Sequence, residues 1–253
     1  MAKVITISQH KGGVGKTTSA VNIGAGLSMG KSGKRVLLID LDPQANLTQS
    51  LGIKNPTRTV YGALRGEYPL TPIKIDERLS IVASTLDLSG AEIELSTETC
   101  RENILRELIQ PHKRNYDYII IDCPPSLGLL TVNALAAADQ VIVPLQTQYL
   151  AVQGLTKLVG VIDKVKTRIN KQFVFGGVLL TQYDGRKTLD KDVAASINTH
   201  FKGRVFATKI RNTVALAEAP SKGQDVFRYA PKSNGAEDYA QLCKEILGKT
   251  DKK

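Results

Sequence analysis

One stretch near the start of the chain constrains the fold more than any other, because it places a glycine-rich turn between an apolar run and a helical pattern. Residues 4–7 predict a buried strand, and residues 19–27 predict a helix. The turn between them reads Lys11-Gly12-Gly13-Val14-Gly15-Lys16-Thr17-Thr18. In this order of elements, backbone N–H groups and the helix N-terminus bind the phosphates of a nucleotide. We therefore predict that residues 11–18, named the phosphate loop below, bind a nucleotide.

Three side chains of the phosphate loop have predicted roles. Lys16 is expected to reach the β- and γ-phosphates, and the Thr17 hydroxyl is expected to ligate Mg²⁺. The usual pattern of such loops has a glycine where His10 stands, and here Lys11 adds a second cation beside the first glycine. A lysine at this place would neutralise the charge that develops during phosphoryl transfer. A solvated loop lysine is the alternative interpretation of Lys11.

Acidic residues follow two of the predicted strands. Asp40 and Asp42 come at the end of the apolar run 36–39, and Asp122 follows the run 119–121. Because the carboxyl ends of parallel strands meet at one edge of a sheet, these carboxylates are expected beside the phosphate loop. There they could hold Mg²⁺, directly or through water, and orient an attacking water molecule. As an alternative, each Asp could cap the helix that follows it.

Apolar strands alternate with helical patterns along the rest of the chain. Further strands are predicted at 35–40, 79–83, 116–122, 140–144 and 173–180, and helices at 86–95, 99–110, 127–138, 150–168, 188–200 and 235–247. Because the strands are apolar throughout, we expect a sheet that is buried on both faces, as parallel sheets are. The predicted fold is α/β, a doubly wound, mostly parallel sheet covered by helices on both faces. Residues 52–78, with several Pro and Gly, are predicted to form a surface loop.

The chain has 253 residues, which fits one large domain, predicted to span 1–253 with a frayed tail at 249–253. Its three cysteines lack metal-ligand spacing, which indicates a reduced, cytoplasmic protein. The chain enters its first predicted strand at once, without room for a signal peptide, and no apolar run is long enough to span a membrane.

The net charge is +10, and the excess lies in the last two-fifths of the chain. Residues 157–253 contain 19 Lys and Arg against 10 Asp and Glu, whereas residues 1–156 contain 15 against 14. Such asymmetry indicates a polyanionic partner, either nucleic acid or an anionic membrane. For DNA, whose phosphates Lys and Arg contact without reading bases, the candidate residues are Arg186, Lys187, Lys202, Arg204, Lys209, Arg211 and Lys222.

These motifs resemble the ParA/MinD family of ATPases with a deviant Walker A loop, in particular its ParA/Soj-type partitioning members. The resemblance runs almost end to end and covers the phosphate loop and the segments 40–44, 122–125, 143–146, 215–221 and 231–236. It implies a P-loop NTPase-like fold that binds ATP and Mg²⁺. In that family the extra lysine reaches the nucleotide of the other subunit, which assigns this role, and a nucleotide-sandwich dimer, to Lys11.

The same resemblance assigns the remaining site residues. Asp40 would position the hydrolytic water, so the catalytic residues would be Lys11, Lys16 and Asp40. Thr17, Asp40 and Asp122 would form the Mg²⁺ site, with Asp122 acting through water. The residues assigned to the nucleotide base are Gln182, Arg211 and Thr213.

The function that the resemblance implies is a Mg²⁺-dependent ATPase for chromosome or plasmid segregation. ATP would drive dimerisation, the dimer would bind double-stranded DNA of the nucleoid without sequence preference, and a ParB-type partner would stimulate hydrolysis. A MinD-like membrane-cycling ATPase is the first alternative, but the residues after Gly248 lack the bulky apolar side chains of a membrane-binding helix, so no stable membrane association is expected. A small-molecule kinase or synthetase is the second alternative, and no acceptor motif for one stands out.

Overall fold

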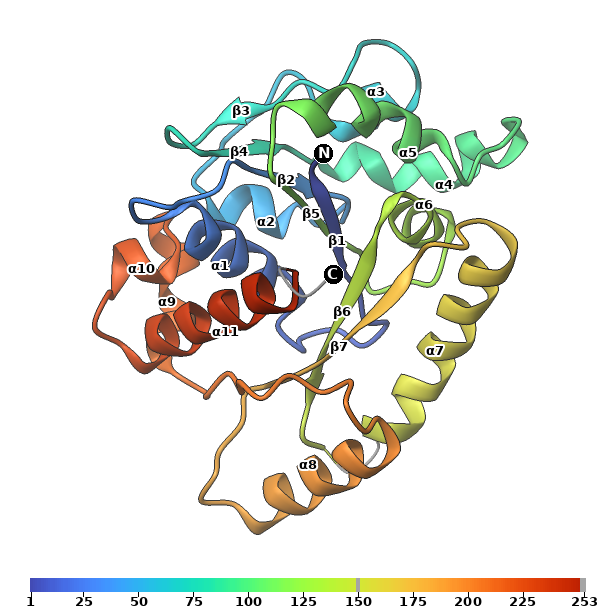
Figure 1. The fold of residues 1–253 in the computed structure, drawn as a ribbon. Helices are drawn as coiled ribbons and strands as arrows, with labels where there is room; N and C mark the ends of the chain where they lie inside the picture. Colours follow the sequence, from blue (N-terminus) through green and yellow to red (C-terminus); the bar gives the residue numbers. More distant parts are fainter. Residues whose placement is uncertain (149–150, 251–253) are drawn as a thin grey trace.

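The computed structural model describes residues 1–148 and 151–250, and a single sheet forms its centre (Figure 1). Its strands are β1 (Lys3–Ile7), β2 (Val36–Asp40), β3 (Ile73–Lys74), β4 (Leu79–Val82), β5 (Tyr118–Asp122), β6 (Gln140–Gln146) and β7 (Val174–Thr181). They are ordered β3-β4-β2-β5-β1-β6-β7, and all are parallel except β3, which pairs antiparallel with β4. The predicted doubly wound, mostly parallel α/β sheet is confirmed.

Helices cover both faces of this sheet (Figure 1). The α-helices are α1 (Lys16–Ser28), α2 (Asn46–Ser50), α3 (Val60–Leu64), α4 (Ala91–Glu94), α5 (Ile104–Ile109), α6 (Leu129–Ala137), α7 (Ala151–Arg168), α8 (Thr188–His200), α9 (Val214–Glu218), α10 (Val226–Tyr229) and α11 (Asn234–Thr250). Short 3₁₀ helices are η1 (Leu86–Gly90), η2 (Leu95–Thr97), η3 (Gln110–Arg114) and η4 (Ala219–Lys222).

Two apolar cores form because alternate residues of the strands point to opposite faces of the sheet. Ile5 and Ile120 belong to one core, together with buried residues of α1, α10 and α11. Val4 and Ile121 belong to the other core, with buried residues of α3, α5, α6 and α7. Burial on both faces explains why the strands are apolar throughout. Charged residues of the strands therefore stand at the strand ends.

Some segments differ from the sequence prediction. Residues 52–78, predicted as a loop, contain α3 and β3, and the predicted helix 86–95 is divided among η1, α4 and η2. The predicted helix 99–110 begins only at Ile104, because Cys100 has a left-handed φ of 53° that a right-handed helix does not contain. By contrast, α8 has the predicted bounds. The predicted tail 249–253 lies partly outside the described residues, and α11 extends to Thr250.

Both side edges of the sheet have little unpaired backbone. At one edge β3 has only two residues. At the other edge the segment after α8 runs along β7, where the Phe206 N–H donates to the Val178 carbonyl (2.9 Å) and the Ile210 N–H donates to the Leu180 carbonyl (2.8 Å). The edge strand β7 is therefore covered by residues 204–210.

Candidate functional site

The phosphate loop connects β1 to α1 at the edge where the parallel strands end. Gly13 and Gly15 have φ angles of 72° and 84°, in the left-handed region that glycine adopts without strain. Gly15 is the N-cap of α1, and no side chain caps this helix. The first N–H groups of α1 therefore remain available to a bound anion. This is the geometry that the sequence predicted for the loop.

Lys16 is held inside the loop. The residue is 7% exposed, and its Nζ donates a hydrogen bond of 3.2 Å to the carbonyl of Lys11. Burial lowers the pKa of Lys16, while the nearby Asp122 and Asp42 act to raise it. The ammonium group is thus held between the loop backbone and the acidic strand ends.

Lys11 points elsewhere, into a chain of glutamine side chains that sequence analysis missed. Its Nζ donates to Gln148 Oε1, and Gln148 Nε2 donates to Gln146 Oε1 (2.9 Å). Gln146 donates in turn to Gln182, whose Nε2 donates to the Gly13 carbonyl (2.8 Å). The chain joins the ends of β6 and β7 to the phosphate loop. Lys11 is exposed, so its ammonium is accessible from outside the subunit.

Asp40 at the end of β2 is wholly buried and its oxygens are occupied. Oδ2 accepts hydrogen bonds from the Thr48 N–H (2.9 Å) and the Thr48 hydroxyl (2.7 Å), and Oδ1 accepts one from the Asp42 N–H (3.2 Å). Burial raises the pKa of Asp40 to about 6, against the opposing effect of these bonds. The prediction that Asp40 orients the hydrolytic water does not fit this arrangement, because the carboxyl is closed to solvent and attaches α2 to β2.

Asp42 is better placed for that role. It stands two residues beyond Asp40, past the end of the strand, and it keeps 6% of its surface exposed while Asp40 has none. One oxygen accepts the Gln44 N–H at 3.0 Å. Both Asp residues were visible in the sequence, but the distinction between them depends on Thr48, eight residues after Asp40, which no local pattern identifies.

Asp122 at the end of β5 is fully buried, and neither of its oxygens accepts a hydrogen bond of ordinary geometry from the described residues. Burial raises the pKa of Asp122 well above its ordinary value, Asp40 raises it further, and Thr17 and Lys16 act to lower it. An unsatisfied buried carboxyl is costly. A cation would satisfy it, and Thr17 and Asp122 offer the hard oxygen ligands that Mg²⁺ prefers.

No cluster of three or more His, Cys, Asp or Glu side chains that could enclose a metal ion occurs within 1–148 and 151–250. A Mg²⁺ ion beside Asp122 would therefore take its other ligands from water and from phosphate oxygens, which is its usual mode of binding at nucleotide sites. The residues present fit a Mg²⁺–nucleotide complex better than a metal ion bound alone.

A cavity of about 300 Å³ adjoins the phosphate loop. Its lining includes Gly15 and Thr18 of the loop and the three residues predicted to contact the base, Gln182, Arg211 and Thr213. The Thr213 hydroxyl is buried and has no hydrogen-bond partner among the described residues, so it can bond to a ligand. The structure thus brings the predicted phosphate and base contacts together.

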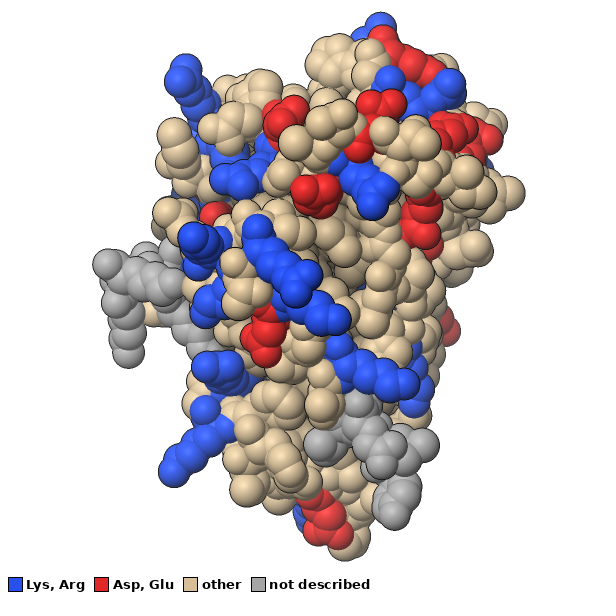
Figure 2. Space-filling view, turned by 90° about the vertical axis from the view of Figure 1, so that its right-hand side faces the viewer, with Lys and Arg blue, Asp and Glu red and all other residues tan. Residues whose placement is uncertain are grey.

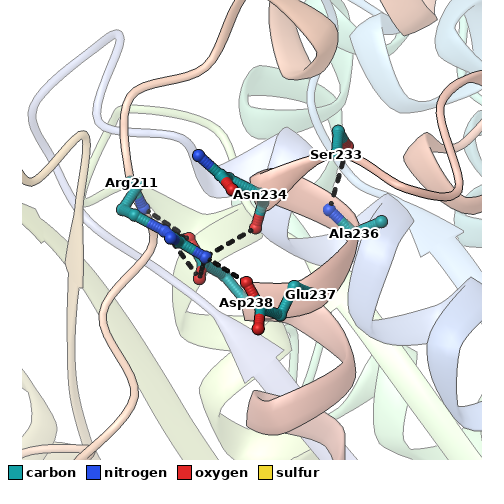
Figure 3. A network of polar contacts seen from close by, with 6 residues as sticks. All are labelled: Arg211, Ser233, Asn234, Ala236, Glu237 and Asp238. Carbon is teal, nitrogen blue, oxygen red and sulfur yellow. Dashed lines mark hydrogen bonds and ion pairs between the residues drawn. The ribbon is translucent and has the colours of Figure 1, made fainter.

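Figure 3 shows that the guanidinium of Arg211 turns toward the start of α11. Nη2 contacts Asp238 Oδ1 at 2.6 Å and Glu237 Oε2 at 2.7 Å, and the backbone N–H donates to Asp238 Oδ2 at 2.8 Å. The hydrogen bonds to Asp238 and Glu237 raise the pKa of Arg211 above its ordinary value. Two carboxylates already neutralise this side chain, so its predicted role as a DNA contact does not fit the structure. It fixes the segment after β7 to α11 instead.

Arg186 and Lys187 lie in the loop between β7 and α8. Together with Arg211 they line a cavity of about 460 Å³ next to the base cavity. Arg186 is 92% exposed and forms two hydrogen bonds of 2.9 Å to Asp184. These two residues are therefore close to the nucleotide site in space, although the phosphate loop is far away in the sequence.

The other predicted DNA contacts are spread over separate elements. Lys202 and Arg204 are exposed after the end of α8. Lys209 lies over the ring of Tyr183, with Nζ 4.3 Å from the ring centroid. Lys222 is the last residue of η4. The next residue, Gly223, contacts Gly52 in the loop after α2. The fold does not gather all the predicted contacts into one patch.

Figure 2 shows a further basic face, over α7, that sequence analysis did not single out. Lys157, Lys164 and Arg168 are exposed at positions i, i+7 and i+11, which lie along one side of α7, and the exposed Lys171 follows in the turn after this helix. No other residue in 1–148 or 151–250 forms an ion pair with them. The helical spacing of these cations was the signal that could have revealed the face.

Comparison with known proteins finds a matching family model and similar proteins. A family model described as an AAA domain matches residues 2–175. The sporulation initiation inhibitor protein Soj of Bacillus subtilis (strain 168) is 45% identical over 251 residues, which cover 97% of this chain and 98% of that protein. The chromosome partitioning protein ParA of Myxococcus xanthus is 45% identical over 253 residues, which cover 98% of this chain and 88% of that protein.

A solved structure agrees with the fold. Cobyrinic acid a,c-diamide synthase from Mycobacterium smegmatis, with bound ADP and magnesium, has a TM-score of 0.86 at 35% identity and covers 98% of this chain and 94% of its own. The sequence identity is higher to the two partitioning proteins than to this synthase, and it extends over nearly the whole chain. The chain therefore belongs to the ParA/Soj family of chromosome-partitioning ATPases.

Proposed function

We propose that this protein is a Mg²⁺-dependent ATPase that segregates DNA. The observation that carries the proposal is the buried Asp122 carboxyl, which lies near Lys16 and Thr17 and accepts no hydrogen bond of ordinary geometry from the described residues. Bound Mg²⁺–ATP would satisfy this carboxyl and place its phosphates on the loop. The names of the relatives, which are chromosome-partitioning proteins, support DNA segregation as the purpose of the ATPase.

ATP binding would use groups that are already in position. The free N–H groups of α1 and the Lys16 ammonium would bind the phosphates, while Thr17 and Asp122 would hold Mg²⁺. The base would occupy the cavity beside Gln182 and Thr213. Mg²⁺, when bound, supplies positive charge that stabilises the phosphoryl group in transfer.

Hydrolysis would depend on a water molecule held by Asp42. The Asp42 carboxylate is the acidic group of β2 and its following loop that keeps exposed surface. Asp40 would be a positioning residue, because its bonds to Thr48 hold α2 and the loop that carries Asp42. The proposal transfers to Asp42 the role that the sequence resemblance gave to Asp40.

Dimerisation would complete the site. Lys11 is exposed and is held by a glutamine on its own subunit, so it can exchange that contact for a stronger one to a phosphate of the other subunit. The exchange becomes favourable only when ATP is bound, because ATP supplies the anion. We therefore expect the protein to be a monomer without ATP and a sandwich dimer with ATP.

DNA binding would use cations that are exposed on the surface, among which Arg186 is also paired with Asp184. Lys187 and the four residues of the α7 face are exposed, and Arg186 extends from the same loop as Lys187. Two such surfaces joined in a dimer would bind phosphates of duplex DNA without reading bases, with strong dependence on salt. Such binding would place the protein on the nucleoid, where a ParB-type partner would stimulate hydrolysis.

The experiment that tests the proposal measures binding to a random-sequence duplex by fluorescence anisotropy with ADP and with ATP. We expect binding with ATP and little with ADP. Arg186→Glu/Lys187→Glu should weaken it at least about tenfold, whereas Lys54→Glu/Lys74→Glu, which changes the net charge equally at exposed sites elsewhere, should not. Equal binding with both nucleotides would contradict the proposed coupling, and equal loss in both variants would contradict the footprint.

The two alternative functions, a MinD-like ATPase and a synthase, predict different results in binding and hydrolysis assays. A MinD-like protein would bind anionic vesicles with ATP. Here Leu242 and Ile246 of α11 are buried, and the helix packs against α1 and α10, so its apolar face is already covered. No helix of the described residues is long and apolar enough to cross a bilayer. A synthase would consume ATP only with an acceptor molecule, so DNA- and partner-dependent hydrolysis would count against it.

A further inference from the structure

A further cavity lies at the opposite edge of the sheet, where the strands begin. It measures about 600 Å³ and forms where residues before β1, β2 and β5 meet. β1 alone separates this edge from the phosphate loop, and its five residues span about 17 Å. A ligand here cannot touch the ATP site, so the cavity belongs to none of the chemistry described above.

Basic side chains dominate the lining of this cavity. Five of its eleven lining residues are cationic and one is acidic, Asp117. The cationic residues come from three separate parts of the chain, and they are Lys3, Lys34, Arg35, Lys113 and Arg114. All five belong to the portion of the sequence in which acidic and basic residues are nearly equal in number. The fold therefore brings together cationic residues that lie far apart in the sequence.

The one acidic group does not balance this charge, because Arg35 already uses it. The Arg35 N–H donates to Asp117 Oδ2 at 2.8 Å, and Arg35 Nη2 lies 3.4 Å from Asp117 Oδ1. Hydrogen bonds from Arg35 lower the pKa of Asp117. Within the described residues, Lys34, Lys113 and Arg114 form no ion pair. Their mutual repulsion would be relieved by an anion in the cavity.

The shape of the cavity restricts the kind of anion. Its volume lies in the range of small-molecule sites, and Tyr116 and Leu247 add an aromatic and an apolar surface to the cations. A duplex would instead contact cations on a convex surface, as on the α7 face. Several cations around one cavity suit several phosphates on one small molecule.

We propose that this cavity is a second ligand site, which binds a small molecule carrying two or more linked phosphate groups, such as a nucleoside polyphosphate. The inference is independent of the proposed ATPase function, because no residue of the cavity belongs to the phosphate loop or to the strand ends that carry Asp42 and Asp122.

Inorganic tripolyphosphate is the probe for this site. The full-length protein, with its phosphate loop first saturated with Mg²⁺–ADP, is titrated by calorimetry at low salt. We expect one additional site per chain, and binding of inorganic orthophosphate at least about tenfold weaker because it offers a single phosphate. The absence of a second site for tripolyphosphate would overturn the proposal.

A matched pair of variants tests the location. Lys34→Glu/Lys113→Glu/Arg114→Glu should weaken tripolyphosphate binding at least about tenfold, while Lys54→Glu/Lys74→Glu/Lys191→Glu, with the same change of net charge at exposed sites, should leave it unchanged. Circular dichroism and Mg²⁺–ADP binding serve as controls for folding in both. Equal weakening in both variants would show a general charge effect, and displacement of tripolyphosphate by a short DNA duplex would assign the cavity to the DNA surface; either result overturns the proposal.

Discussion

Asp40 and Asp122 stand opposite each other in register on the neighbouring strands β2 and β5, yet among the described residues only the Asp40 carboxyl is held by hydrogen bonds of ordinary geometry. The charge of Asp40 adds to burial in raising the pKa of Asp122. Two buried carboxyls on adjacent strands ionise together only at a cost in free energy, unless a cation lies between them and the bound phosphates. The nucleotide-free protein therefore contains an electrostatic strain that Mg²⁺–ATP would relieve.

The first prediction follows for stability against pH. In the unfolded chain Asp122 ionises near its ordinary pKa of 3.8, and in the folded chain its pKa is well above that value. Between the two values the folded chain keeps a proton that the unfolded chain has lost, so the free energy of unfolding falls as pH rises. Asp40, with a pKa of about 6, acts in the same direction between about pH 4 and 6. Asp122→Asn should flatten this fall and stabilise the nucleotide-free protein near neutral pH by on the order of 1 kcal/mol.

Urea unfolding at a series of pH values, with and without Mg²⁺–ATP, measures both effects. The variant should lose most of the additional stability that Mg²⁺ gives to the ATP complex of the wild type. If Asp122→Asn leaves the dependence of the unfolding free energy on pH unchanged, the Asp122 carboxyl of the wild type has a hydrogen-bond partner in solution.

The second prediction separates Asp42 from Asp40. Asp42→Ala should keep ATP binding and lower turnover by roughly two orders of magnitude, because the water loses its acceptor. Asp40→Ala should act through the structure, by releasing the Thr48 N–H, so that amide hydrogen exchange at Thr48 becomes faster. Single-turnover hydrolysis and exchange measured by NMR test the pair. If Asp40→Ala abolishes turnover with unchanged exchange while Asp42→Ala remains active, the original assignment to Asp40 is correct.

The third prediction concerns nucleotide affinity. Lys16→Ala removes the ammonium that the loop holds in place, and ATP affinity should fall by roughly a hundredfold or more, the scale of removing a buried charge contact. Lys11→Ala is the matched control, because Lys11 points to Gln148 within its own subunit and should be nearly silent in the monomer. Titration calorimetry with ATP and Mg²⁺ compares the two. Undiminished affinity in Lys16→Ala would reject the phosphate loop.

The fourth prediction concerns dimerisation. With ATP and Mg²⁺, sedimentation should show dimers for the wild type and monomers for Lys11→Ala. Gln148→Ala removes the contact that holds Lys11 in its own subunit, together with the hydrogen bond from Gln148 to Gln146, so this variant should dimerise at an equal or lower concentration. A Lys11→Ala protein that dimerises like the wild type would show that the lysine does not cross between subunits.

The parts of the site that follow from local order were predictable. The phosphate loop depends on a strand, a turn and a helix that are adjacent in the chain, and Gly13 and Gly15 are required there by positive φ angles. The alternation of apolar strands and helices was sufficient to predict the mostly parallel sheet. Local patterns failed where backbone angles decided the outcome, as at Cys100, whose left-handed φ prevents the predicted helix.

The parts that depend on packing were not predictable. Asp40 and Asp42 differ because Thr48 bonds to one of them, and Lys11 and Lys16 differ because Gln148 holds one of them. The predicted role of Arg211 as a DNA contact does not fit the structure, because two acids of α11, more than twenty residues later, neutralise its charge. Charge counted along the chain indicated the C-terminal part alone, whereas the fold also assembles a basic cavity from N-terminal residues.

The coverage of both side edges of the sheet has a consequence for how copies of this protein associate in a crowded cell. With β3 reduced to two residues and β7 paired along residues 204–210, neither edge offers a long row of backbone groups to a strand from another chain. Irreversible growth of a shared sheet is thereby suppressed, and any association between copies is left to side chains and loops. Closed edges therefore favour contacts between copies that can form and break again.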